Sequence, residues 1–188
     1  MDRQFVTAFA LLLIALLGHG VSRAASAWQP ADLPPLRRAK EQPKHKPVPI
    51  IVDGKPAATL VILPSAGDMR APVKELQDIV KEITGQTLPT AKAIPAQGPA
   101  IVVGDCEAAR AAGLDPEKLE PEGYAIATAP GRVYIVGWRE LGHAHGLSAL
   151  MERCLGVRWY WPKQVGGRYV PDVKTVRELL GHLSTSSI

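Results

Sequence analysis

Three observations predict an α+β fold in which two main helices pack on a mixed, largely antiparallel sheet. Short β-branched runs are separated by turn signals such as Asp53-Gly54. Two longer segments instead carry apolar residues at helical spacing. These helical segments lie between pairs of predicted strands, an order typical of mixed sheets with helices packed on them.

Six strands are expected in the folded part of the chain. The first two, over residues 49–52 and 58–63, flank the turn pair Asp53-Gly54, so we expect them to form a hairpin. A second hairpin is expected across Ala129-Pro130-Gly131. The strands predicted after the first hairpin cover residues 100–103, 124–128, 132–136 and 157–161.

Two main helices are predicted from the apolar spacing. The first runs from about Val73 to Ile83, and Gly85 stands where a C-terminal cap is expected. The second covers about residues 139–155, and its apolar stripe is Leu147, Leu150, Met151, Cys154 and Leu155. Gly142 and Gly146 lie one turn apart on this helix, so we expect them to let it approach the sheet closely.

Residues 1–27 are predicted to be a signal peptide. Residues 5–17 are almost continuously apolar, and Ala25-Ser26-Ala27 has the small-x-small pattern that signal peptidase accepts. The apolar run is about 13 residues long, whereas a membrane-spanning helix needs roughly 18–20, so an uncleaved anchor is the weaker interpretation. We therefore expect an exported protein, periplasmic or extracellular, that is not an integral membrane protein after cleavage.

Charge and proline content separate a linker from the folded domain. Residues 28–49 are basic and rich in proline, as expected of an extended linker. Residues 50–188 hold 15 Lys and Arg against 15 Asp and Glu. A nucleic-acid-binding domain normally carries its basic surface on the fold itself, so no nucleic-acid partner is expected. We expect the domain to span residues 50–171, followed by a tail over 172–188.

The most metal-like pattern is His143-Ala144-His145. On a helix, positions i and i+2 point about 200° apart, so these imidazoles cannot share one ion, and we expect both on the helix surface. The His-Glu-x-x-His pattern of helical zinc proteases does not occur in the sequence. No metal or other cofactor is predicted.

Acidic residues gather in one proline-containing loop that lacks an apolar shell to raise a carboxyl pKa. They are Asp115, Glu117, Glu120 and Glu122. The Gly-x-Ser-x-Gly nucleophile motif does not occur either. No catalytic residue is therefore predicted, and whether the protein is an enzyme stays open.

A run of aromatic residues near residue 160 is the unusual feature of the sequence. In a strand, Val157, Trp159 and Trp161 face one side and Tyr160 the other. Tryptophan can fill a core or stack on the C–H face of a sugar. We expect Trp159 to pack in the core beside Val157 and Trp161 to be exposed at the strand end. Carbohydrate binding by Trp159, Tyr160 and Trp161 is the alternative.

Two cysteines, Cys106 and Cys154, remain in the exported part. An oxidising compartment allows a disulfide between them. Cysteine is also a common small core residue, and the sequence does not give the distance between the two, so both states stay open.

Several motifs carry a family resemblance that extends from about Pro49 to Pro171. They are residues 51–56 (IVDGKP), 75–85, 101–105 (IVVGD), 122–126 (EGYAI), 131–137 (GRVYIVG) and 155–162 (LGVRWYWP). In this order they resemble the accessory domain that precedes the catalytic barrel in α-glucuronidases and β-hexosaminidases, in the form found at the start of large exported bacterial proteins. The segment 142–146 departs from the family, which usually has a small residue and an aromatic there.

The resemblance implies a zincin-like fold without its metal centre. It also implies that the family's catalytic carboxylates lie in a following (β/α)8 barrel. The printed sequence continues for only 17 residues after Pro171, so no catalytic residue can be transferred, and we expect a truncated or split gene product. Two functions compete: a non-catalytic accessory domain of a glycoside hydrolase-type protein, with a barrel as partner, and an exported module that binds polysaccharide through the aromatic strand.

Overall fold

The computed structural model describes residues 44–161, 167–178 and 183–184. The predicted signal peptide and residues 28–43 of the predicted linker lie outside this part of the chain. Within it, none of the helices has the length and apolar character needed to cross a membrane.

The main sheet has six strands in the order β11-β6-β7-β5-β3-β4. Its strands are β3 (Thr59–Ile62), β4 (Thr90–Ala91), β5 (Ala100–Val103), β6 (Tyr124–Ala129), β7 (Arg132–Gly137) and β11 (Leu183–Ser184). The pairs β3–β4, β3–β5 and β5–β7 are parallel, whereas β6–β7 and β6–β11 are antiparallel. The β6–β7 pair is the hairpin expected across Ala129-Pro130-Gly131.

Two smaller sheets complete the described strands. One has the order β10-β1-β2, formed by β1 (Val48–Val52), β2 (Lys55–Pro56) and β10 (Val176–Glu178). The other is the hairpin of β8 (Arg158–Trp159) and β9 (Arg168–Tyr169). Five of the eight pairings between described strands are antiparallel, which confirms the predicted α+β class with mixed, largely antiparallel sheets.

The first predicted hairpin is wrong in its second strand. The turn at Asp53-Gly54 forms, but it joins β1 to β2 rather than to the run over 58–63. The backbone N–H groups of Ala57 and Ala58 donate to the carbonyl of Ile50, after which the chain leaves this sheet. Residues 59–62 then pair in parallel with β5, because their side chains are apolar enough to be buried in the main sheet.

The domain limits also differ from the prediction. Val48, inside the predicted linker, is buried in β1. The predicted tail contains β10, which pairs with β1, and Val176 of that strand is buried. Both segments extend the fold because their apolar side chains close the hydrophobic core beside β1.

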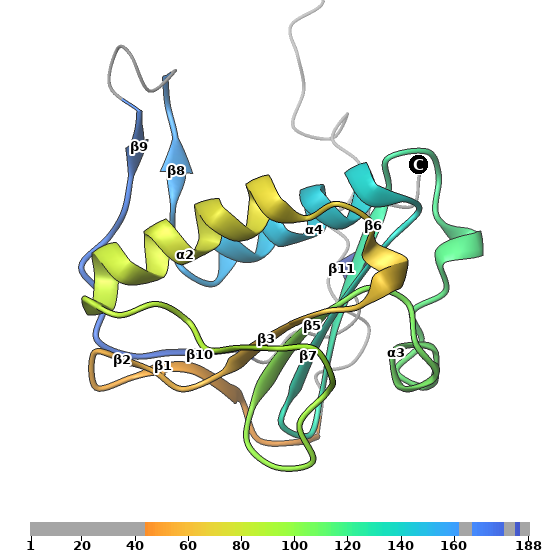
Figure 1. Cartoon of the computed structure of the whole chain (residues 1–188), viewed down its shortest axis with the longest axis horizontal. Helices are drawn as coiled ribbons and strands as arrows, with labels where there is room; N and C mark the ends of the chain where they lie inside the picture. The colour runs from red at the N-terminus through yellow and green to blue at the C-terminus, as the bar shows by residue number, and fades with distance from the viewer. Residues whose placement is uncertain (1–43, 162–166, 179–182, 185–188) are drawn as a thin grey trace, which may run out of the picture. The chain divides into compact units, whose positions relative to one another are not determined.

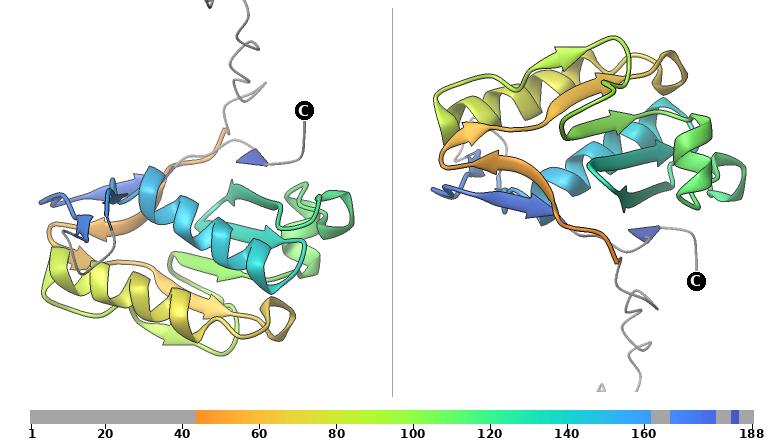
Figure 2. Two further views of the ribbon diagram at one scale, coloured as in Figure 1. Left: turned by 90° about the horizontal axis from the view of Figure 1, so that it is seen from above. Right: turned by 90° about the horizontal axis from the view of Figure 1, so that it is seen from below.

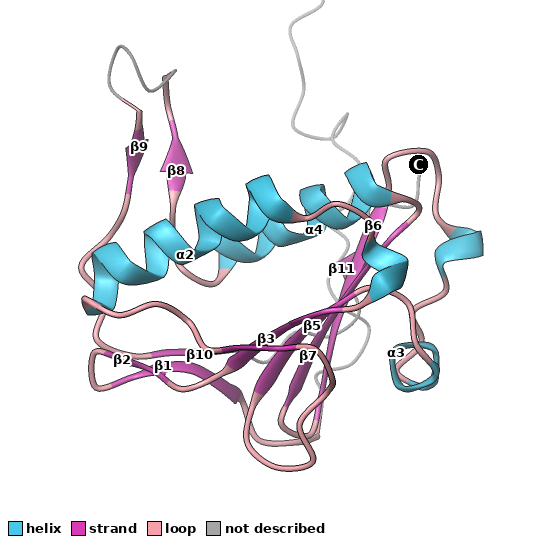
Figure 3. Cartoon of the chain, viewed as in Figure 1, coloured by secondary structure: helices cyan, strands magenta, loops and turns pink. Residues whose placement is uncertain are grey.

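The two main helices, α2 (Arg70–Thr84) and α4 (Glu140–Arg153), lie side by side on one face of the main sheet (Figures 1 and 2). Figure 3 shows the shorter helical elements at one end of the domain. These are η2 (Pro64–Ala66), α3 (Glu107–Ala111) and η3 (Pro116–Lys118). Gly85 ends α2 in the left-handed conformation, with φ 75°, as its position predicted.

Alternation along the central strands divides the core into two clusters. Ile101 and Ile135 belong to the cluster that contains the apolar residues of α2 and α4. Val102 and Val136 face the other way and pack with residues of α3 and the loop that follows it. The expected stripe of α4 enters the first cluster, in which Leu147, Leu150, Met151 and Leu155 are buried and Cys154 is partly buried.

Candidate functional site

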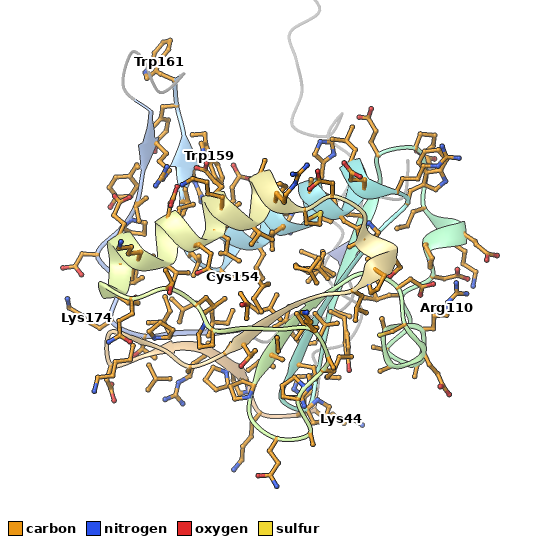
Figure 4. The ribbon with its side chains drawn as sticks, in the orientation of Figure 1. Lys44, Arg110, Cys154, Trp159, Trp161 and Lys174 are labelled. Atoms are coloured by element: carbon orange, nitrogen blue, oxygen red, sulfur yellow. The ribbon has the colours of Figure 1, made fainter. Side chains whose placement is uncertain are left out.

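The β8–β9 hairpin exposes aromatic side chains. The exposed fractions are 38% for Trp159, 65% for Tyr160, 67% for Trp161 and 54% for Tyr169. Figure 4 shows Trp161 at the outer end of the hairpin and Trp159 close to the helices. The prediction that Trp159 packs in the core is therefore wrong, whereas Trp161 is exposed as predicted.

The exposure of Trp159 has its cause in the direction of the chain after Val157, a residue that is fully buried. The next strand, β8, pairs with β9 and does not join the main sheet. A two-stranded ribbon that leaves the sheet does not carry the core contacts of residue 157 on to residue 159, although both share a strand face.

Ion pairs link this hairpin to α2. Arg168 of β9 donates through Nη1 to Glu75 Oε1 at 3.0 Å and through Nη2 to Glu82 Oε2 at 3.1 Å. The Arg168 side chain is only 16% exposed, which reduces screening of these pairs by solvent. On β8, Arg158 Nη1 donates to the backbone carbonyls of Glu152 and Val157.

A shallow pocket of about 280 Å³ opens between the base of the hairpin and α4. It is lined by Tyr124, His145, Ser148, Ala149, Glu152 and Trp159. The three polar residues contributed by α4 follow one another at intervals of three and four positions, so they share one face of the helix. The pocket thus combines one exposed indole with a row of hydrogen-bonding side chains.

The position of this helix depends on its two glycines. A Cβ on Gly146 would lie 2.5 Å from Cγ2 of Ile135 in β7, and one on Gly142 would overlap the carbonyl oxygen of Gly123. This agrees with the close approach expected from the sequence. The same packing sets the distance of His145 and Ser148 from the sheet.

The two histidines of α4 point apart, but only one is on the surface. His145 is exposed, whereas His143 is 2% exposed, which corrects the prediction that both are surface residues. His143 Nδ1 donates to the Arg139 carbonyl at 2.8 Å, and its Nε2 is buried with no hydrogen-bond partner among the described residues. Burial lowers the pKa of His143, so the neutral ring is favoured. In the described part of the chain, no three His, Cys, Asp or Glu side chains gather as metal ligands.

The acidic loop has the electrostatics of a charge-paired surface. Arg110 pairs with Asp105 at 2.7 Å and lies 3.9 Å from Asp115, and Lys118 lies 3.3 Å from Asp115. The pKa of Asp115 is lowered, chiefly because its carboxylate accepts the backbone N–H of Glu117. A general acid needs the opposite shift.

Comparison with known families identifies the domain. The profile described as "Glycosyl hydrolase family 67 N-terminus" matches residues 53–148. The chain belongs to this family. As a family 67 N-terminal domain it is a glycoside hydrolase-associated domain, as the sequence motifs indicated. The matched residues include His145 and Ser148 of the pocket but end before Ala149, Glu152 and the aromatic hairpin.

Solved structures of glycosidases resemble parts of the chain. The exo-β-N-acetylglucosaminidase of Vibrio harveyi has a TM-score of 0.44 and 13% identity over 77% of this chain and 17% of its own. A family GH115 4-O-methyl-α-glucuronidase with specificity for decorated arabinogalactans has a TM-score of 0.48 and 19% identity, over 69% of this chain and 18% of its own. The β-N-acetylhexosaminidase of Streptomyces coelicolor A3(2) has a TM-score of 0.42 and 17% identity, over 74% of this chain and 25% of its own. This chain thus spans a quarter or less of the length of these three proteins. No curated protein matches the chain.

The structure separates residues that the sequence grouped and groups others that it missed. Trp159 lines the pocket, whereas Trp161 and Tyr160 do not. No disulfide joins Cys106 and Cys154, which pack in the clusters on opposite faces of the sheet. The polar face of α4 was not predicted as a site, although its spacing in the sequence is a readable signal.

Proposed function

We propose that this domain is a non-catalytic accessory domain of an exported carbohydrate-active enzyme and works beside a catalytic (β/α)8 barrel. The family match over residues 53–148 carries this proposal. A zincin-like fold without a metal centre belongs to the same proposal. Chelation is accordingly expected to leave the melting temperature unchanged, and a drop that zinc restores would contradict it.

The environment of the carboxylates supports a non-catalytic role. Glu120 and Glu122 are exposed, so neither lies in the apolar pocket that typically surrounds a catalytic general acid. The pKa of Asp68 is lowered to about 2, first because its carboxylate accepts hydrogen bonds from the Arg70 side chain. Asp115 is shifted in the same direction.

The test is an activity assay on the purified full chain with nitrophenyl glycosides, including a glucuronide and an N-acetylglucosaminide. We expect no turnover above that of a mock preparation. Glu120→Gln and Glu122→Gln serve as the matched variants. Turnover that persists through repurification and is lost in either variant would overturn the proposal.

Export is tested separately from catalysis. We expect the mature chain to begin between Ala25 and Trp28, after the small-x-small pattern. Expression in a secreting bacterial host followed by N-terminal sequencing measures this. Secreted protein that still begins at Met1 would show that residues 1–27 are not removed.

The exposed hairpin favours a second candidate function, glycan binding. Trp159, Tyr160 and Trp161 are all exposed, and large exposed aromatic surfaces often mark interaction sites. Affinity electrophoresis through gels containing xylan, arabinogalactan or chitin derivatives tests this. Retardation in any of these gels supports glycan binding, and equal mobility in all of them contradicts it.

A further inference from the structure

We propose that the pocket between β8 and α4 binds a single neutral pyranose ring, with Trp159 as the stacking surface and His145, Ser148 and Glu152 as the hydrogen-bonding side. This inference rests on the second candidate function, glycan binding, and names its site and ligand class. It differs from a general aromatic platform because it assigns binding to Trp159 and not to Trp161.

The aromatic side of the site comes from the base of the hairpin. Trp159 is 38% exposed and lines the pocket, so part of its ring is available to a ligand while the rest packs against the domain. Trp161 lies at the outer end of the hairpin, away from the helices (Figure 4). An indole that is partly held by packing loses little conformational freedom when a sugar stacks on it.

The polar side of the site comes from α4. His145, Ser148 and Glu152 supply a ring nitrogen, a hydroxyl and a carboxylate on one helix face. Adjacent hydroxyls of a pyranose donate and accept, and a carboxylate can accept from two of them. Ala149 lies among these residues in the lining and has a side chain too short to fill the space between them.

The volume of the pocket is enough to accommodate about one ring. Its volume is about 280 Å³. Pockets that enclose drug-sized ligands start at roughly 300 Å³, so one ring of a longer glycan fits and the rest of the chain stays outside.

The charge of the pocket selects a neutral ring over a uronate. Glu152 is the only Asp or Glu in the lining, and its carboxylate would repel the carboxylate of a uronic acid. The neighbouring guanidinium, Arg158, is held by the carbonyls of Glu152 and Val157 and does not line the pocket. The site therefore favours a sugar that carries a hydroxymethyl group or a hydrogen at C5.

The test compares methyl β-glucopyranoside with methyl β-glucuronide, which differ only in a hydroxymethyl group and a carboxylate, and adds methyl β-xylopyranoside. NMR titration of the full chain measures binding. For such a shallow site we expect a Kd on the order of 1–10 mM for the neutral sugars, and binding of the glucuronide at least about fivefold weaker. Comparable or tighter binding of the glucuronide would overturn the assignment.

Four variants locate the site. Trp159→Ala is expected to weaken binding of the neutral sugars by about tenfold or more, and Trp161→Ala to leave it unchanged. Glu152→Gln, on the exposed helix face, is expected to weaken the neutral sugars several-fold and to reduce their preference over the glucuronide, because it removes the charge. Ser148→Ala is a mild variant that keeps the fold, and should weaken binding by a smaller factor. Circular dichroism checks each fold.

Two failures are distinguishable. In the first, polysaccharide gels retard the parent, and this retardation is abolished by Trp161→Ala but not by Trp159→Ala. Glycan binding then stands, and the pocket assignment is overturned. If neither the gels nor the titrations detect binding, the second candidate function fails together with the pocket.

Discussion

Substitution of Gly142 by alanine tests whether backbone contact sets the position of α4 on the sheet. The added Cβ would overlap the carbonyl oxygen of Gly123 and lie 3.1 Å from Cα of Gly137. Both neighbours are backbone atoms, so no side-chain rotation relieves the contact. The helix must move away from the sheet, and its exposed face, which carries His145 and Ser148, must move with it.

The expected loss follows from two opposing contributions. Overpacking of a close contact costs about 1–3 kcal/mol, and two backbone contacts place Gly142→Ala at the upper end of that range. Alanine is more favourable than glycine by up to about 1 kcal/mol in a helix, and less in its first turn, where residue 142 lies. We expect a net decrease of about 2 kcal/mol in the free energy of unfolding, or about 4–8 °C in Tm.

Thermal and urea melts of the full chain measure this change. Ser148→Ala is the control, because it raises helix propensity in the same helix without adding an atom. We expect the control to melt within about 2 °C of the parent, since substitutions of this kind usually change stability by less than about 0.5 kcal/mol. If Gly142→Ala is as stable as the parent, the close approach does not restrain α4 and the reasoning is wrong.

Two further predictions concern ionisable side chains that are buried or partly buried. Because burial lowers the pKa of His143, the unfolded chain binds a proton at this residue more strongly than the folded chain does. The free energy of unfolding should therefore fall as the pH drops below about 6.5, by at most about 1.4 kcal/mol per pH unit. In urea melts at pH 5 to 7, His143→Gln should reduce the dependence of the unfolding free energy on pH, whereas His145→Gln, on the surface, should not. Equal pH dependence in the parent and in His143→Gln would refute this prediction. Arg168→Ala removes two ion pairs made by a side chain that is 16% exposed, and should lower the free energy of unfolding by about 1–3 kcal/mol. Hydrogen exchange in β8 and β9 should become faster. The control Lys74→Ala removes an exposed ion pair within a helix and should cost less than about 0.5 kcal/mol. Unchanged exchange in Arg168→Ala would show that these pairs do not hold the hairpin.

Local patterns in the sequence predicted much of the fold. Apolar spacing gave both main helices, and Gly85 marked the end of the first. The turn residues at 53–54 and 129–131 were placed correctly, as were the central strands. These features depend on interactions between residues close in the sequence, for which the identity of a few side chains is sufficient. The paired glycines of α4 were also readable, because only glycine allows a helix so close to a strand.

The candidate site, in contrast, was decided by tertiary structure. Alternation showed that Trp159 shares a strand face with Val157, but not that the strand leaves the sheet between them. Helical spacing separated His143 from His145, but the burial of His143 depends on which face the sheet covers. Pairing between strands far apart in the chain decides both, and periodicity carries no information about it. The pocket joins β6, α4 and β8, so only the folded chain brings Trp159 to the polar face of the helix.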